Sequence, residues 1–356
     1  MQTKILLTAV FAALSLAACS DKSANQTGGA SQSATSAAGE KIVLKIAHPW
    51  PATAMVQKQI LEPWCEKLGV DSNQALSCQF YPAMQLGGTP QQLIDQVQDG
   101  VADIVWTLPG YTPGRFPSME VMEIPFLTQG ASNSSRVAWK MYQEFGQKDF
   151  EAVKPLSFNV HDRGHIHNNV RPITQLSDIR GLKLRAPTRL TNKMVEALGG
   201  IPVSVPMPGL ADAVSKGVVD GYILPWEIVP TLKLHEMTKY HSEINSPELY
   251  SALFVVAMNK QRYESLPENL RQVIDKHSGE EFAASIGKAW DESVQAAREQ
   301  AVKRGNAINE ITGEQLAEIQ KVAGKVESDW IAEMKTKGYD GEAMVKRARE
   351  LVAQGK

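Results

Sequence analysis

Apolar side chains between residues 42 and 258 follow two patterns in turn, short β-rich runs and longer stretches with helical spacing. Residues 42–47 are rich in β-branched side chains, and residues 55–68 carry apolar side chains at helical intervals. The run SALFVVAM at residues 251–258 is apolar throughout, which is typical of a strand buried on both faces. This alternation predicts an α/β protein made of parallel strand–helix units. Further strands are expected at residues 79–81, 102–106, 156–160, 182–185, 203–205 and 220–224, and further helices at residues 91–98, 191–198 and 210–215.

A Pro- and Gly-rich stretch at residues 109–125 divides this pattern, and from residue 266 onward the spacing is almost entirely helical. The chain has 356 residues, whereas single hydrophobic cores stop growing at about 250–300 residues. We therefore expect two α/β lobes followed by a helical C-terminal tail.

The charge balance argues against a nucleic-acid partner. The chain has 37 Lys and Arg residues against 39 Asp and Glu residues, and no basic block that suggests a phosphate-binding face. The sequence also contains no Gly-rich phosphate loop and no GxSxG nucleophile motif. We therefore expect no nucleic acid, no cofactor and no enzymatic activity.

The first forty residues have the pattern of an export signal followed by a tether. Residues 1–18, expected to be a signal peptide, hold an apolar run shorter than the roughly 20 residues of a membrane-spanning helix. The run ends in Leu-Ala-Ala before Cys19, which is similar to a bacterial lipoprotein signal; an ordinary secretory peptide is the alternative. Residues 19–40 are mostly small and polar and predict a flexible linker. We expect an exported protein that is attached to the membrane only through a lipid on Cys19.

Two further cysteines, Cys65 and Cys78, remain after this processing. An even pair in an oxidising compartment favours a disulfide, which would tie the first predicted helix to the second strand. Two separate buried thiols are the alternative. Two ligands are too few for a metal site.

Arg185 is the clearest candidate for binding an anion. It ends a predicted strand just before Ala186 and Pro187, and ligands of α/β proteins sit beyond the strand ends. Its planar guanidinium matches a carboxylate. From this pattern alone, a salt bridge at the surface or between the lobes is an equally good interpretation.

Three histidines, His161, His165 and His167, lie within seven residues. On an extended segment the side chains of His165 and His167 face the same way and can share a ligand or an ion. A periplasmic metal-dependent hydrolase or lyase is therefore an alternative function. The structural alternative is a set of polar residues that bond to the backbone at a strand end.

Five motifs in the right order resemble those of the solute-binding proteins of TRAP transporters, the C4-dicarboxylate-binding family, over about residues 42 to 270. Three of them form the core of the resemblance, and two more are similar to a loop of the first lobe and to the helix between the lobes. The three core motifs are DIRGLKLR (178–185), GGIPV (199–203) and GVVDG (217–221). The segment similar to the first-lobe loop is FPSMEVMEIPFL (116–127), and the segment similar to the interlobe helix is KLHEMTKY (233–240).

The resemblance implies a two-lobed periplasmic binding protein of type II-like α/β fold, with hinge strands and a long interlobe helix. Lobe I would hold residues 41–160 plus about 251–290, and lobe II residues 161–250 plus about 291–356. Arg185 falls on the arginine with which this family pairs the ligand carboxylate. The loaded receptor would deliver its ligand to the TRAP membrane subunits, which an ion gradient drives. A sensory binding protein is the alternative within the same class.

This chain also departs from the family pattern. Gly164 stands where many relatives carry a second arginine, and the run YILPWE at residues 222–227 replaces a more polar stretch. Both changes remove polar donors, and three tryptophans are expected at strand ends near the cleft, although core packing is the alternative for each. We therefore expect an aromatic monocarboxylate as the ligand. Beside Arg185, the expected ligand-binding residues are His165, His167, Trp50, Trp106, Trp226, Met207 and Glu227.

Overall fold

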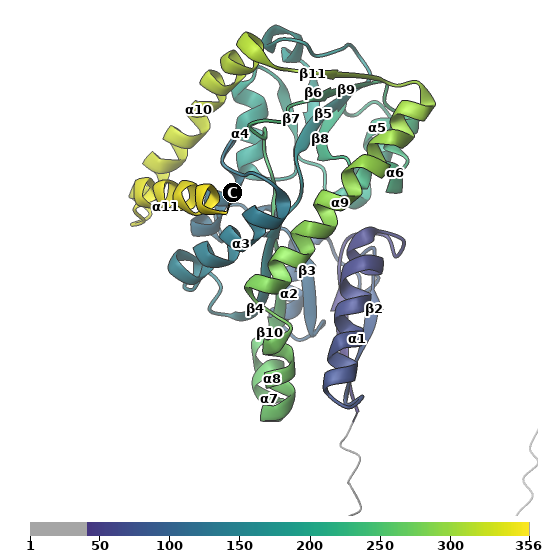
Figure 1. The fold of residues 1–356 in the computed structure, drawn as a ribbon, viewed down its shortest axis with the longest axis vertical. Coiled ribbons are helices and arrows are strands. Elements are labelled where there is room, and N and C mark those ends of the chain that lie inside the picture. The colour runs from purple at the N-terminus through teal and green to yellow at the C-terminus, as the bar shows by residue number, and fades with distance from the viewer. Residues whose placement is uncertain (1–40, 356) are drawn as a thin grey trace, which may run out of the picture. The chain divides into compact units, whose positions relative to one another are not determined.

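Two mixed β-sheets organise residues 41–355, the part of the chain that the computed structural model describes (Figure 1). The first sheet has the strand order β2-β1-β3-β10-β4, and the second has the order β11-β9-β5-β8-β6-β7. The expected two-lobed α/β fold is confirmed, with one sheet in each lobe. The strands of the first sheet are β1 (Ile42–Ala47), β2 (Leu76–Tyr81), β3 (Ile104–Thr107), β4 (Val153–Val160) and β10 (Leu253–Asn259). Those of the second are β5 (Gly164–Asn168), β6 (Lys183–Arg185), β7 (Ile201–Val203), β8 (Gly221–Pro225), β9 (Tyr240–Glu243) and β11 (Ala307–Glu310).

Both sheets contain parallel and antiparallel pairs, so the expectation of parallel units alone was wrong. β1 pairs in parallel with β2 and β3, and β6 pairs in parallel with β7 and β8. β10 runs antiparallel to β3 and β4, and β5 runs antiparallel to β8 and β9. Through β5 and β10 the chain enters each sheet directly from the other. These strands therefore lack the helical crossover that makes successive strands parallel.

Three segments join the lobes. Residues 161–163 lead from β4 to β5, residues 244–252 lead from β9 to β10, and α9 (Glu280–Arg304) runs between the lobes (Figure 1). The helix has 25 residues, a length of about 37 Å at 1.5 Å per residue. It packs against α3 and β4 of the first lobe and against α6 of the second.

The interlobe helix does not lie at residues 233–240, where the motif resemblance placed it. That segment holds a short 3₁₀ turn, Leu234–Glu236, and the start of β9. Lys233 has a φ of 54°, a left-handed conformation that cannot continue the preceding helix α6 (Ile228–Thr231).

Helices cover both sheets and form the C-terminal tail. α3 packs on α9 and β4, α10 packs on α4, and α11 returns to α3. The strong helical patterns were predicted, whereas α3, β5, β9 and β11 were not among the expected elements. Within residues 41–355, no helix is both long and apolar enough to cross a membrane. The remaining helices are α1 (Glu62–Asp71), α2 (Leu93–Gln98), α3 (Ala131–Met141), α4 (Arg189–Ala197), α5 (Leu210–Ser215), α7 (Lys260–Ser265), α8 (Glu268–Lys276), α10 (Gly313–Thr336) and α11 (Gly341–Gln354).

A disulfide joins Cys65 in α1 to Cys78 in β2, with Cα atoms 6.1 Å apart. The pair is therefore bonded and does not form two separate thiols. The predicted signal peptide (residues 1–18), Cys19 and the linker (residues 19–40) lie outside the described residues.

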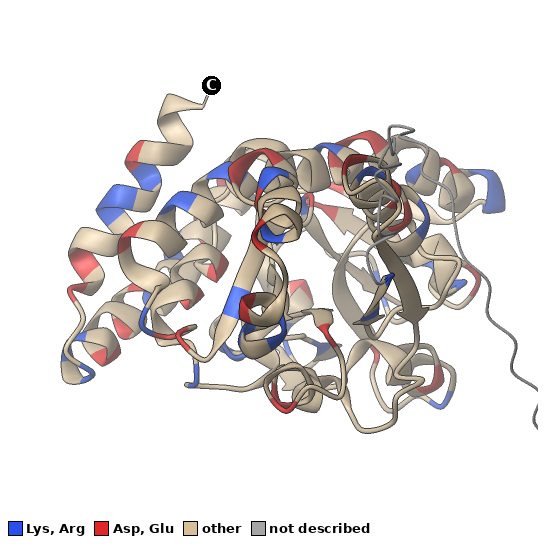
Figure 2. Cartoon of the chain, turned by 90° about the horizontal axis from the view of Figure 1, so that it is seen from below, with Lys and Arg blue, Asp and Glu red and all other residues tan. Residues whose placement is uncertain are grey.

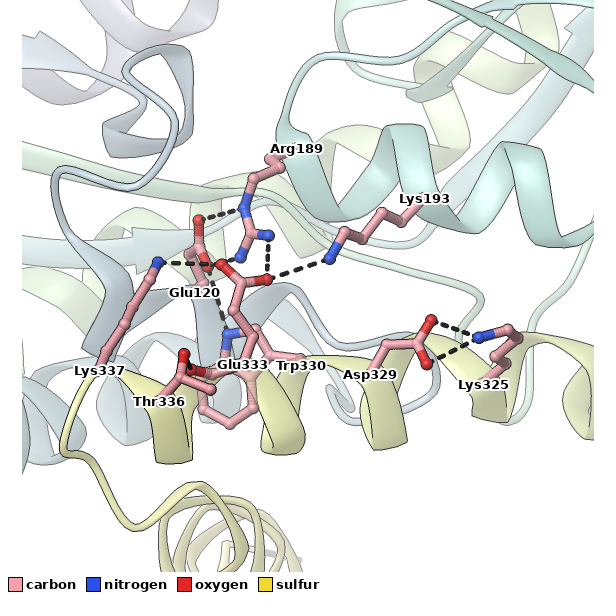
Figure 3. Close-up of polar contacts among 9 residues, drawn as sticks. All are labelled: Glu120, Arg189, Lys193, Lys325, Asp329, Trp330, Glu333, Thr336 and Lys337. Atoms are coloured by element: carbon pink, nitrogen blue, oxygen red, sulfur yellow. Dashed lines mark hydrogen bonds and ion pairs between the residues drawn. The ribbon is translucent and has the colours of Figure 1, made fainter.

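A partly buried ion network connects the two lobes and the tail (Figure 3). The guanidinium of Arg189, at the start of α4, donates to both carboxylate oxygens of Glu120 from the first lobe. Its Nη1 also lies 2.6 Å from Glu333 Oε2 on α10, and Lys193 approaches the same oxygen at 3.1 Å. Because Arg189 lies four residues after Arg185, this network holds the chain just beyond the strand end that carries Arg185.

Elsewhere the charged side chains of both signs are interspersed along the helices (Figure 2). Many pair one helical turn apart, such as Lys58 with Glu62 at 2.7 Å and Lys325 with Asp329 at 2.6 Å. Exposed pairs of this kind contribute only about 0–1 kcal/mol each. These exposed pairs therefore contribute little to the relative placement of the lobes.

Candidate functional site

A small cavity lies where strand ends of the two sheets face each other. Trp50 and Leu108 follow β1 and β3 of the first lobe, while Arg185 and Leu224 lie at the ends of β6 and β8 in the second. The crevice beyond the carboxyl ends of strands is the usual ligand site of α/β proteins.

Arg185 lines this cavity and is completely buried. Its Nε donates to the Val205 carbonyl oxygen at 2.8 Å. Among the described residues, neither Nη1 nor Nη2 has a hydrogen-bond partner. A buried charge with two unused donors is costly, so this end of the cavity is built for an anion that accepts from both nitrogens.

Two tyrosine hydroxyls lie close to this guanidinium. Tyr111 and Tyr250 are buried, and neither hydroxyl has a partner within residues 41–355. Burial raises the pKa of both phenols, and the nearby positive charge of Arg185 offsets part of that rise. Both hydroxyls therefore remain protonated and can donate beside Arg185. Sequence reasoning missed both tyrosines, because no motif contains them.

Gly164 explains how Tyr250 reaches the cavity. A Cβ atom at position 164 would lie 1.9 Å from Cε1 of the Tyr250 ring. The ring therefore occupies the space of any larger side chain at the position where the sequence comparison expected an arginine. The absence of a side chain at Gly164 was the one signal in the sequence that pointed to this arrangement.

His161 lines the cavity, but its nitrogens serve the backbone. Its Nε2 accepts from the Ala252 N–H at 3.0 Å, so its Nδ1 carries the proton and donates to the Asp162 carbonyl oxygen. Burial lowers the pKa of His161 to about 4. The ring is therefore neutral at pH 7 and contributes an aromatic surface to the segment of residues 161–163, which crosses between the lobes.

Aromatic rings form the walls. The Trp50 ring lies 5.6 Å from that of Phe254, which stacks on Trp290 at 5.4 Å and 20°. Met207 also lines the cavity. Trp106 does not: it packs behind the wall against Trp50 and Trp290 at 5.6 and 5.7 Å. Core packing, the alternative considered for each tryptophan, therefore applies to Trp106.

His165 and His167 were expected to touch the ligand, but neither lines the cavity. His167 Nε2 donates to the Leu224 carbonyl oxygen at 3.1 Å, so its Nδ1 accepts from His241 Nδ1 at 2.7 Å. His241 Nε2 then accepts from the Asn306 side-chain amide at 2.9 Å. The chain of donors and acceptors is closed, and it leaves His167 no nitrogen for a ligand.

The rest of this histidine cluster is structural too. His165 Nδ1 accepts from the Ile244 N–H at 3.4 Å, and Trp226 Nε1 donates to Glu243 at 2.8 Å. Burial lowers the pKa of His165 to about 3 and that of His167 well below its usual value. In residues 41–355, no group of three or more His, Cys, Asp or Glu side chains is arranged to hold a metal ion. The expected ligand contacts of His165, His167 and Trp226 are therefore corrected.

Glu227 does line the cavity, beyond the end of β8. Its Oε1 atom has no hydrogen-bond partner in the described chain. Burial raises the pKa of Glu227 to about 7, and the neighbouring Trp290 offsets part of that rise. The cavity thus has a cationic end at Arg185 and a second polar group at Glu227.

A larger hollow of about 690 Å³ lies on the first lobe, between α1 and the start of α9. Its polar groups are already engaged: Trp64 Nε1 donates to the His277 carbonyl oxygen, and Lys276 pairs with Asp71 at 2.6 Å. The cavity between the lobes differs from this hollow, because it is lined by the completely buried Arg185 with two Nη donors that no described residue uses.

Comparison with known proteins gives the same assignment. Residues 46–333 match the family described as bacterial extracellular solute-binding protein, family 7, DctP. Two solved TRAP solute-binding proteins are each 40% identical with TM-scores of 0.87. One, from a marine metagenome and specific for aromatic acid ligands, holds 3-hydroxybenzoate; the match covers 89% of this chain and 99% of that one. The other, from Rhodoferax ferrireducens, holds copurified benzoate, with 88% and 98% covered.

A relative in Rhodobacter capsulatus, the C4-dicarboxylate-binding periplasmic protein DctP, is 25% identical over 82% of this chain and 87% of its own length. The family match covers most of the described residues. The chain belongs to family 7 of the bacterial extracellular solute-binding proteins, the periplasmic receptors of TRAP transporters, and is a solute receptor and not an enzyme.

Proposed function

We propose that this receptor binds an aromatic monocarboxylate in the interlobe cavity, with the carboxylate on Arg185. The observation that carries the proposal is the completely buried guanidinium, with two unused donors, inside a cavity walled by Trp50, Phe254 and Trp290. The Tyr111 and Tyr250 hydroxyls add two more donors beside it. Aromatic rings gain about 0.5–1.5 kcal/mol per pair beyond simple burial. The relatives that hold benzoate and 3-hydroxybenzoate support the same ligand class.

A ligand in this position would touch both lobes, because Trp50 belongs to the first and Arg185 to the second. Its full set of contacts exists only when the lobes are closed, so binding shifts the population toward the closed form. The moving bodies would be residues 41–160 plus about 251–290 and residues 161–250 plus about 291–356. The tail links them, since α11 packs on α3 of the first lobe. Closure would tell the TRAP membrane subunits that the receptor is loaded.

Calorimetric titration with benzoate tests the role of Arg185. Removing one partner of a desolvated charge pair costs about 2–5 kcal/mol, so Arg185→Ala should weaken binding roughly 30-fold to several thousand-fold. Arg185→Lys should also bind poorly, because an ammonium cannot replace the planar fork. Arg347→Ala, which removes an exposed arginine of α11 that pairs with Glu144, is the matched control. Unchanged affinity in Arg185→Ala would reject the assignment.

The proposal extends to membrane attachment through a lipid on Cys19. It is supported by the Leu-Ala-Ala-Cys pattern and the polar residues that follow. Cys19→Ser should then move the protein from the membrane fraction to the soluble periplasmic fraction. A wild-type protein found only in the soluble fraction would contradict the anchor.

A further inference from the structure

Glu227 and Trp290 place an unused acceptor and an unused donor in one part of the cavity. Glu227 follows the end of β8 and is 7% exposed, and Trp290, on α9, is 2% exposed. Neither Glu227 Oε1 nor Trp290 Nε1 has a hydrogen-bond partner among residues 41–355. Both side chains line the same cavity and approach each other there: no hydrogen bond of normal geometry joins them, yet the Trp290 indole N–H is near enough to the Glu227 carboxyl to offset part of the rise that burial causes in its pKa. Buried polar groups without partners cost free energy, which a bound ligand can recover.

This second polar group is not paired with the guanidinium. Glu227 and Arg185 line the same cavity, yet among the described residues neither Nη atom of Arg185 nor Oε1 of Glu227 has a hydrogen-bond partner. One acidic neighbour, the buried Asp162, lies near Glu227, because the charge of Glu227 contributes to the raised pKa of Asp162. A second carboxylate on the ligand would therefore be repelled at this end.

A hydroxyl group matches the pair, because it can donate one hydrogen bond and accept another. The hydroxyl would donate a hydrogen bond to Glu227 Oε1, and its oxygen would accept a hydrogen bond from Trp290 Nε1. A plain aromatic ring leaves both groups unsatisfied, and an ammonium group cannot accept from the indole.

Building on the proposed function, we infer that Glu227 and Trp290 together bind a hydroxyl on the ligand ring, so that the preferred solutes are hydroxy-substituted aryl monocarboxylates. Arg185 holds the carboxylate, Glu227 and Trp290 hold the hydroxyl, and the ring lies against Trp50 and Phe254. Glu227 is therefore the residue that determines the preference for hydroxylated over unsubstituted aromatic acids.

The test compares the dissociation constants of benzoate, 3-hydroxybenzoate and 4-hydroxybenzoate by titration calorimetry. Wild-type protein should bind at least one hydroxybenzoate about tenfold or more tightly than benzoate, which corresponds to about 1.4 kcal/mol. Glu227→Leu should reduce that ratio to within about twofold, whereas Glu227→Gln, which keeps an oxygen acceptor, should retain most of it. Trp290→Phe should lower the ratio by removing the donor while keeping an aromatic wall.

Glu248→Gln is the matched control, because Glu248 is a buried carboxyl with a raised pKa that does not line the cavity. In Glu248→Gln, the ratio of the dissociation constants of benzoate and hydroxybenzoate should equal that of the wild type. Thermal melting of the ligand-free variants checks that each is folded; Glu227→Leu removes an unsatisfied group and should fold normally.

Equal affinity of the wild type for all three acids, or an unchanged preference in Glu227→Leu, would overturn the inference. If benzoate binds and depends on Arg185 while the hydroxyl preference is missing, the proposed function stands and only this inference fails. If no aromatic acid binds the folded wild type, the proposed function fails and the inference falls with it.

Discussion

The cavity and the histidine cluster are two buried groups of aromatic and polar side chains, yet their hydrogen bonding is opposite. In the histidine cluster, His167, His241 and Asn306 form a closed series of donors and acceptors. In the cavity, Arg185 and Glu227 keep polar atoms that no described residue satisfies.

The difference teaches how a binding site is distinguished from a polar core. Burial and residue type are similar in both regions, and burial lowers the pKa of His161 in one and His241 in the other to about 4. A satisfied cluster stabilises the fold, whereas an unsatisfied one reserves its hydrogen bonds for a ligand. The state of hydrogen bonding, and not the presence of imidazole or indole rings, indicates where the solute binds.

The largest effect on stability should come from breaking the closed series. His167→Ala would leave the His241 donor and the Leu224 carbonyl oxygen unpaired and would open a cavity, so we expect a loss of about 3 kcal/mol in unfolding free energy. Affinity for benzoate should stay within about threefold of wild type. Urea unfolding and calorimetry measure the two quantities. The control is His277→Ala, which removes a partly exposed pair with Asp71. If His167→Ala lost as much affinity for benzoate as Arg185→Ala, the contrast between the histidine cluster and the cavity would be rejected.

The two regions should also respond to pH in opposite directions. The pKa of Glu227 rises from 4.5 to about 7 on folding, so its contribution to stability is complete below pH 4.5 and is lost as pH rises to about 7. The pKa of His165 falls from 6.5 to about 3, so its contribution is complete above pH 6.5 and is lost as pH falls.

Unfolding free energies of ligand-free protein between pH 4.5 and 7.5 test this pair of slopes. The unfolding free energy of Glu227→Gln, relative to that of the wild type, should increase by about 1 kcal/mol per pH unit as pH rises from 4.5 to 7. The relative unfolding free energy of His165→Gln should increase by a similar amount per pH unit as pH falls from 6.5 toward 4.5. Slopes of the same sign in both variants would show that the regions do not differ electrostatically.

The smallest expected effect is a gain in stability at the cavity. Arg185→Met keeps most of the volume of the side chain and removes a buried charge that the described chain does not pair. The unfolding free energy of the ligand-free protein should rise by about 1 kcal/mol, even though binding is lost. Destabilisation by more than about 1 kcal/mol would mean that Arg185 has a structural role beyond the bond from its Nε to the Val205 carbonyl oxygen, and that its two Nη donors are not reserved for the solute.

Much of the fold was predictable from residue order. The apolar run at residues 251–258 became β10, whose seven residues are all buried, and the helix expected at residues 210–215 is α5. The strand–helix alternation could not show that β5 and β10 are antiparallel, because their direction depends on where the chain crosses between lobes. β9 and β11 were missed because each has only four residues and pairs with a strand far away in sequence.

The site was predictable in part. Arg185, Trp50, Met207 and Glu227 line the cavity, and each lies at or beyond a strand end or in a turn, a position that sequence patterns reveal. The Tyr111 and Tyr250 hydroxyls carried no such signal. His165 and His167 were misleading because their close spacing suggested shared ligation, while their partners, His241 and Asn306, lie more than seventy positions along the chain from His167.

Residue order was therefore sufficient for the two-lobed α/β class, for the export-type N-terminal pattern and for an arginine at a strand end, because each depends on local spacing and composition. Which polar groups are satisfied inside the molecule was settled by packing alone. Hydrogen bonds join atoms from strands distant in sequence, and a donor such as Arg185 Nη1 counts as unused only once every neighbouring acceptor has been placed in space.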